Sequence, residues 1–187
     1  MKASIFLMVI ASMLVTTVNS QNTKNAVTDL ILTTYSEKAF TSEPVTDQQL
    51  DIILKAGIKA PSARNNQPWK FTVINDESTM KEIYNTALPG NIMIVVSGLE
   101  AENGITPDFD CGLATENMFI AVHGLGLGAH IYGSPAGKIN SNKQLYQIPE
   151  GYKAIVVLRI GNVDKSVDAV SAASPRKSMK EVVNYKK

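Results

Sequence analysis

The sequence predicts an α+β domain in which helices flank a central mixed or antiparallel sheet. Helical and strand-like segments follow one another without the regular alternation that builds a parallel sheet. Two short runs, residues 92–96 and 154–160, are apolar except for Arg159 and are typical of buried strands. Hydrophobic residues make up 44% of the 187-residue chain, which is enough for the core of one domain of ordinary size.

The N-terminus has the pattern of a secretory signal peptide. Lys2 precedes an uncharged apolar stretch at residues 5–15, and residues 18–20 offer a small-residue cleavage site. An uncleaved anchor is the alternative, but the stretch is short for a membrane span. We therefore expect a signal peptide at residues 1–20 and a single mature domain at residues 21–187. The protein would then be exported, periplasmic or secreted, without stable membrane insertion after cleavage.

Charge and cysteine content exclude several classes of function. The formal net charge is +1 and no basic cluster stands out, so nucleic acid is a poor candidate partner. The single cysteine, Cys111, rules out an intrachain disulfide and a cysteine metal cluster. We find no motif for zinc and expect no metal site.

The sequence of the first part of the domain predicts two helices. A first helix begins at residues 27–32, and residues 33–40 follow as a loop or extended segment. A second helix starts after Thr46, because Gln49 three residues later completes a capping box. One face of the second helix is apolar and should pack on the core; its members are Leu50, Ile53, Leu54 and Gly57.

The remaining elements follow from hydrophobic patterns and turn residues. Small and apolar residues on most faces of the segment at 109–125 predict a central helix. The expected elements are a strand at 69–75, a helix from Ser78 to about Thr86, a strand at 92–96, the helix at 109–125, an extended segment at 129–132, a helical piece at 141–146, a strand at 154–160 and a short helix at 179–183.

The most informative segment is the loop at residues 60–71, APSARNNQPWKF. Pro61 stops the preceding helix. Ser62 and Asn65 are turn formers whose side chains can bond nearby backbone, and Pro68 forces Gln67 into an extended conformation. A loop so rich in donors suits a flat ligand with polar edges, although an ordinary helix-to-strand connection is the alternative.

This loop resembles the P-S-x-x-N-x-Q-P-W signature of the FMN-dependent nitroreductase family. Two further blocks match in order and spacing: SEKAF at residues 36–40, and FDCGLATENMFIAVHGLGLGAHIYG at residues 109–133. The resemblance covers roughly residues 27–184. It implies a nitroreductase-like dimeric fold, bound FMN, and NADH or NADPH as co-substrate. Electrons would pass by a ping-pong mechanism to a small-molecule acceptor such as a nitroaromatic or a quinone.

The resemblance also implies which residues hold the phosphate of FMN. Ser36 and Lys38 match the family's Arg-x-Ser-x-Arg/Lys block, whereas Thr34 stands where the first arginine is usual. Losing that arginine removes a charge-assisted contact worth about 1.5–3 kcal/mol. Arg176 is the best match to the arginine of the family's C-terminal segment, with Lys177 as the fallback and a merely solubilising tail as the alternative.

Other matching positions would line the flavin ring. By resemblance, Asn65 is the main side-chain contact, and Gly133 is the backbone donor that faces flavin N5. Arg64 occupies a variable position. The remaining positions carried over are Pro61, Ser62, Ala63, Gln67 and Ser134.

Several other residues receive structural interpretations. Asp110 fits a helix N-cap better than a catalytic role, and His123 and His130 lack a metal-ligand spacing. Cys111 is either a low-pKa thiol at a helix start or, preferably, a buried one. The GLGLG run at residues 124–128 favours a helix C-terminus with glycines at positive φ over a nucleotide loop. The sequence needs no catalytic side chain, since the flavin carries the chemistry.

Two other functions remain open. The export signal and Thr34 both motivate a flavin-binding or flavin-processing protein of the same fold without nicotinamide turnover. A non-catalytic binding protein that has lost the cofactor is the third hypothesis.

Overall fold

The computed structural model describes residues 25–100, 107–168, 170 and 174–186, so the expected signal peptide lies outside the described residues. The elements in chain order are α1 (Ala26–Thr33), α2 (Asp47–Ile58), the 3-10 helix η1 (Ala63–Asn65), β1 (Trp69–Ile74), α3 (Glu77–Ile83), β2 (Ile92–Leu99), α4 (Asp108–Gly124), β3 (Gly128–Tyr132), α5 (Ala136–Ser141), β4 (Tyr152–Gly161) and α6 (Met179–Val182).

A four-stranded sheet forms the centre of the domain. Its strand order is β1-β2-β4-β3, and every neighbouring pair is antiparallel. The α+β class is therefore confirmed, with an antiparallel sheet rather than a mixed one. Strand β2 is buried except at its last residue, and β4 is buried from Val157 to Gly161 and partly buried before that, as their largely apolar sequences predict.

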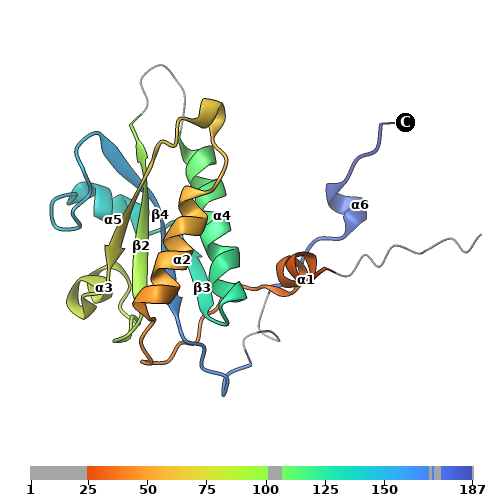
Figure 1. Cartoon of the computed structure of the whole chain (residues 1–187), viewed down its shortest axis with the longest axis horizontal. Coiled ribbons are helices and arrows are strands. Elements are labelled where there is room, and N and C mark those ends of the chain that lie inside the picture. The colour runs from red at the N-terminus through yellow and green to blue at the C-terminus, as the bar shows by residue number, and fades with distance from the viewer. Residues whose placement is uncertain (1–24, 101–106, 169, 171–173, 187) are drawn as a thin grey trace, which may run out of the picture.

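Helices cover both faces of the sheet and create two apolar cores (Figure 1). On one face, α2 and α4 pack side by side against Ile92, Ile94, Val96, Leu158 and Ile160. On the other face, α3 and α5 cover Met93, Val95 and Val157. The alternation of side chains along β2 and β4 divides the two cores, because successive residues of a strand point to opposite faces.

Helix α2 forms as its capping box predicts. The Thr46 hydroxyl accepts a hydrogen bond from the Gln49 N–H at 3.2 Å, and the Thr46 N–H donates to Gln49 Oε1 at 3.0 Å. Gly57 on its apolar face lies against α4, where a Cβ would stand 2.8 Å from Met118 Cγ. This close approach explains why a glycine is tolerated inside the helix despite its cost to helix stability.

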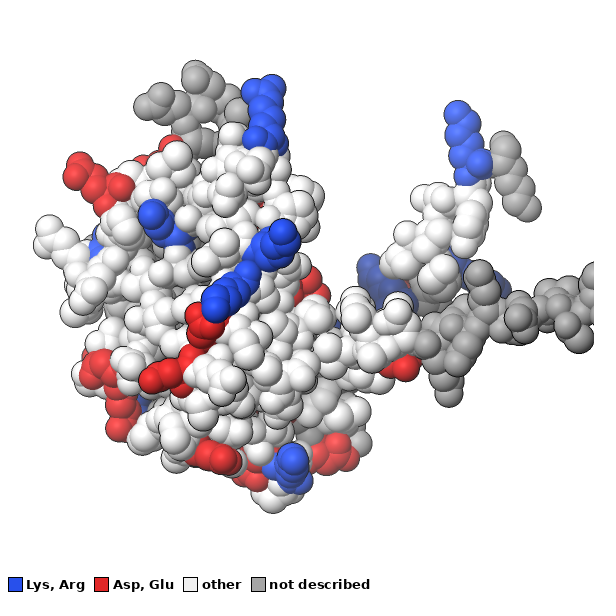
Figure 2. All heavy atoms as spheres, in the orientation of Figure 1, with Lys and Arg blue, Asp and Glu red and all other residues white. Residues whose placement is uncertain are grey.

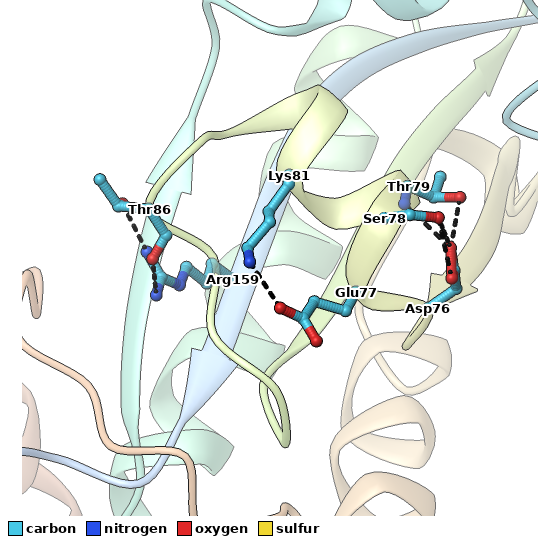
Figure 3. Close-up of polar contacts among 7 residues, drawn as sticks. All are labelled: Asp76, Glu77, Ser78, Thr79, Lys81, Thr86 and Arg159. Carbon is cyan, nitrogen blue, oxygen red and sulfur yellow. Dashed lines mark hydrogen bonds and ion pairs between the residues drawn. The ribbon is translucent and has the colours of Figure 1, made fainter.

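Two predicted helix positions are wrong. Helix α3 begins after Asp76 rather than at Ser78, because the Asp76 carboxylate accepts hydrogen bonds from the Thr79 N–H at 2.9 Å and from the Ser78 hydroxyl (Figure 3). The helix also ends at Ile83 instead of Thr86. Helix α5 ends at Ser141, where the sequence predicted a helical piece to begin, and the turns after it bring Tyr146 into the core.

A buried arginine ties β4 to the connection before β2. Arg159 is 2% exposed, and its guanidinium donates to Asn91 Oδ1 at 2.7 and 3.0 Å and to the Thr86 carbonyl at 2.8 Å. Figure 3 shows Thr86 meeting this guanidinium, which also lies 4.4 Å from the centre of the Phe40 ring. The hydrogen bonds offset the cost of burying the charge.

Helix α6 stands apart from the body of the domain in Figure 1, whereas α1 lies beside the end of α4. Both helices expose large apolar side chains, as does the segment after α6; these side chains are Val27, Ile31, Leu32, Met179, Val182 and, beyond α6, Tyr185. In the described part of the chain, no helix is long and apolar enough to cross a membrane. On the face shown in Figure 2, acidic and basic side chains are scattered among uncharged ones.

Candidate flavin site

The loop at residues 61–68 has an unusual backbone. Arg64, Asn65 and Gln67 adopt φ values of 52°, 56° and 47°, in the left-handed region that favours glycine. Each left-handed non-glycine residue costs roughly 1–2 kcal/mol. Such strain persists only where the surroundings enforce it, and it is typical of ligand sites. The expected extended conformation of Gln67 is therefore wrong.

Three side-chain hydrogen bonds hold this loop in place. The Asp110 carboxylate, on the first turn of α4, accepts a hydrogen bond from the Ala63 N–H at 3.1 Å. The Ser62 hydroxyl accepts one from the Gln67 N–H at 2.9 Å, and Gln67 Nε2 donates to the Asn65 carbonyl at 3.3 Å. The predicted N-cap role of Asp110 is wrong, because Pro107 occupies the cap position and Asp110 anchors the loop instead.

The loop presents its predicted site residues to solvent. Pro61, Ala63, Asn65 and Gln67 are exposed and Ser62 is partly exposed. Their arrangement leaves polar groups of the loop open to a ligand from outside the subunit.

Ser36 and Lys38 lie in a different part of the molecule, next to the start of β3. Both are exposed, and they flank Glu37, which is completely buried. The Glu37 N–H donates to the Ala129 carbonyl at 2.8 Å, and His130 Nδ1 lies 2.6 Å from the Glu37 carbonyl. The segment is thus fixed to the edge of the sheet by its backbone.

Gly133 and Ser134 follow β3 directly and are exposed. The Gly133 carbonyl accepts a hydrogen bond from the Ala136 N–H at 3.2 Å, which starts the turn into α5. A Cβ added to Gly133 would meet no heavy atom within 4 Å. The space beside this backbone is therefore open.

Arg176 is exposed on the segment that precedes α6 and stands apart from the body of the domain. Ser178 and Glu181 form a capping box that starts α6 just after it. Within one subunit, Arg176 is therefore not gathered with the other predicted site residues.

The 61–68 loop and the Ser36–Lys38 segment lie at opposite ends of the sheet. The loop adjoins the end of β2, where the Leu99 N–H donates to the Pro68 carbonyl. Glu37 adjoins Ala129, which pairs through Ile160 with Ile92 at the start of β2. Eight residues of strand span about 24 Å. One subunit therefore presents the predicted residues as separate groups.

Cys111 and His123 have structural roles, as the sequence predicts. Cys111 is buried, and burial, followed by the charges of Asp108 and Asp110, raises its pKa to about 12, which excludes a reactive thiolate. Burial lowers the pKa of His123, whose ring packs on Phe119. Among the described residues, no group of three metal-ligating side chains exists.

The GLGLG segment ends α4 as the preferred interpretation predicts, but only one of its glycines needs a positive φ. Gly126 has φ 76°, whereas Gly124 is the last residue of α4 and Gly128 begins β3. A Cβ on Gly128 would stand 2.7 Å from Glu37 Cγ, so this glycine is needed for close packing.

Solved nitroreductases have the same fold as this chain. A sequence model of the nitroreductase family matches residues 31–96. A provisionally named nitroreductase from Desulfovibrio desulfuricans, solved in complex with FMN, superposes with a TM-score of 0.74 at 26% identity, covering 88% of this chain and 99% of that one. The chain resembles the nitroreductase family in sequence and shares its fold.

Two relatives known by sequence are similar over most of their length. A protein of Archaeoglobus fulgidus, provisionally named NADH dehydrogenase/NAD(P)H nitroreductase, is 29% identical over 143 residues, which are 71% of this chain and 82% of the relative. The NADPH-flavin oxidoreductase of Vibrio harveyi is 24% identical over 164 residues, which are 76% of this chain and 68% of the relative.

Proposed function

We propose that this protein is an FMN-dependent oxidoreductase that passes electrons from NADH or NADPH to nitroaromatic, quinone or similar small-molecule acceptors. The observation that carries the proposal is the strained 61–68 loop, with three left-handed non-glycine residues held by Asp110 and Ser62. The names of the relatives, which include an NAD(P)H nitroreductase and an NADPH-flavin oxidoreductase, support it.

The residues present fit a flavin. The 61–68 loop offers exposed amide and hydroxyl groups for its polar edge, and the open backbone at Gly133 offers a place for its ring. Ser36, Lys38 and Arg176 would meet the phosphate. A bound FMN supplies two-electron chemistry, taking hydride from the nicotinamide and reducing the acceptor. The side chains of the site bind and orient, and none of them needs to transfer a proton.

We further propose that the protein acts as a homodimer. The loop and the Ser36–Lys38 segment are too far apart in one subunit to hold a single flavin, so a second copy must supply one of the two groups. The exposed apolar side chains of α1 and α6 would form part of the interface. Size-exclusion chromatography with light scattering tests this, and a stable monomer that binds flavin would contradict it.

A visible spectrum tests the enzyme proposal. We expect an oxidised-flavin band that NADH or NADPH bleaches under anaerobic conditions. A band that does not bleach would favour the flavin-binding or flavin-processing alternative. No band after addition of FMN would favour the non-catalytic binding protein.

A matched pair of variants tests whether the 61–68 loop binds FMN. Asn65→Ala should weaken FMN binding, because it removes the exposed amide side chain and places alanine at a left-handed position that asparagine tolerates better. Asn66→Ala is the control, since Asn66 has an ordinary φ of −71°. Equal FMN affinity of the two variants would argue against the assigned role of Asn65.

We also propose export, with residues 1–20 removed as a signal peptide. The charge and apolar pattern of the sequence support this. Sequencing the N-terminus of the mature protein tests it, with Gln21 expected as the first residue. An intact Met1 in a cytoplasmic fraction would contradict it.

A further inference from the structure

The Glu37 carboxylate lies inside the proposed phosphate segment, and the proposed function gives it no role. Glu37 is fully buried, whereas Ser36 and Lys38 on either side are exposed. Its Oε1 accepts hydrogen bonds from the N–H groups of Lys38 at 2.7 Å and Ala39 at 2.8 Å. Its Oε2 is also buried, and among the described residues the Tyr35 hydroxyl is the one further donor that approaches the carboxylate. The donors around this carboxylate are therefore neutral groups, and no cation of the described residues forms an ion pair with it.

Nearby groups do not neutralise the carboxylate. The ion pairs found in the described part of the chain do not include Glu37. Burial lowers the pKa of His123 although the charge of Glu37 acts in the opposite direction, so the imidazole favours its neutral form. Burial, then the hydrogen bond and charge of Glu37, and the charge of Asp168 raise the pKa of Tyr35. Negative charge therefore dominates the inner side of this segment.

The carboxylate also occupies backbone donors that an anion would use. Successive N–H groups in a loop form a concave site for phosphate oxygens. Here the N–H groups of Lys38 and Ala39 are already bonded to Glu37 Oε1. Thr34 adds no charge where an arginine would add one. A phosphate would meet Lys38 and the Ser36 hydroxyl on one side and the field of a buried carboxylate on the other.

We propose that Glu37 is a specificity-determining residue that cancels most of the contribution of the flavin phosphate. The protein then binds riboflavin nearly as tightly as FMN. This inference rests on the proposed function, because it concerns the flavin that the same site takes.

The test compares the dissociation constants of FMN and riboflavin, measured by quenching of flavin fluorescence, for the wild-type protein, Glu37→Gln and Glu43→Gln. Glutamine keeps the size of Glu37 and an oxygen for the two N–H donors, and it removes the charge. Glu43 is exposed on the same stretch of chain, so its variant makes the same change in net charge without touching the segment.

For the wild-type protein, we expect the two dissociation constants to agree within about threefold. Glu37→Gln should tighten FMN about tenfold, the scale expected for one charge at a partly desolvated site. Riboflavin affinity should stay unchanged, and Glu43→Gln should behave as wild type. High salt should reduce the gain in Glu37→Gln, because the gain is electrostatic.

Two results would overturn this inference without affecting the proposed function. The first is a wild-type protein that binds FMN more than about 100-fold tighter than riboflavin. The second is a ratio of the FMN and riboflavin dissociation constants that does not change in Glu37→Gln. If Glu37→Gln does not fold, as judged by circular dichroism, the wild-type ratio decides by itself. If neither flavin binds to the wild-type protein, the proposed function falls together with this inference.

Discussion

Replacing Asp110 tests whether the strained loop is built for ligand binding. Asp110 is 6% exposed, and its carboxylate links α4 to the Ala63 N–H across 47 residues of sequence. Alanine removes this link, while asparagine keeps an oxygen in the same place without the charge. The two variants therefore separate the geometry of the anchor from its charge.

The size of the effect follows from the loop. A hydrogen bond to a charged group contributes roughly 1.5–3 kcal/mol. We expect about 1.5 kcal/mol for Asp110→Ala, because Ala63 is exposed and water can replace the lost acceptor. For a chain of this length, that corresponds to a fall in melting temperature of about 3–6 °C. The three left-handed residues together store roughly 3–6 kcal/mol, so a loop that has lost its anchor should relax.

Flavin titration and urea unfolding provide the two assays. Asp110→Ala should bind flavin at least about tenfold more weakly, since a loop that must be re-strained on binding loses about 1.4 kcal/mol or more. Asp110→Asn should lose about half as much in both assays. Unchanged flavin affinity in a destabilised Asp110→Ala would refute the link between loop strain and binding. Equal losses in the two variants would mean that the charge, not the geometry, is required.

Three further predictions concern the core and the open backbone. Gly57→Ala should destabilise the fold by about 1–3 kcal/mol in urea, because the new Cβ would stand 2.8 Å from Met118 Cγ; a gain in stability, as is usual for alanine in a helix, would contradict the packing. The Cys111 thiol should not react with a thiol reagent until the protein unfolds. Its pKa is raised from 9.0 to about 12, so the unfolded thiol loses its proton first, and this contribution to stability is present below pH 9 and lost as the pH rises toward 12. Gly133→Ala should leave the melting temperature unchanged, because the added methyl meets only open space in the subunit, and it should weaken flavin binding in that space. Gly137→Ala, whose Cβ is equally free, is the control. Equal flavin affinity of the two variants would exclude Gly133 as a contact of the flavin.

Local signals in the sequence predicted much of the fold. The capping box at Thr46, the apolar face of α2 and the largely apolar strands β2 and β4 all formed as expected. In each case the stabilising partner lies within a few residues, or the apolar pattern itself shows which faces are buried: one face of α2, and both faces of the two central strands. The sequence is therefore sufficient where local preference and burial agree.

The residues that depend on distant partners were not predictable in this way. Arg64 and Gln67 have no preference for left-handed backbone, and their geometry depends on anchors that include Asp110, 47 residues from its partner Ala63. Glu37 and Arg159 are charged residues that appear solvated in sequence but are buried. Their burial depends on hydrogen bonds that only the tertiary structure brings together.

The antiparallel pairing of β2 with β4 has a consequence for how the chain folds. The paired residues, from Leu99 and Tyr152 to Ile92 and Ile160, are separated by 53 to 68 positions in the sequence. The middle of the sheet therefore cannot form from a local hairpin. Pairing between residues so far apart in the sequence raises the contact order, which slows folding. The ribosome must synthesise the chain as far as β4 before the central strands can meet, and until then one edge of the apolar strand β2 has no partner and is open to aggregation.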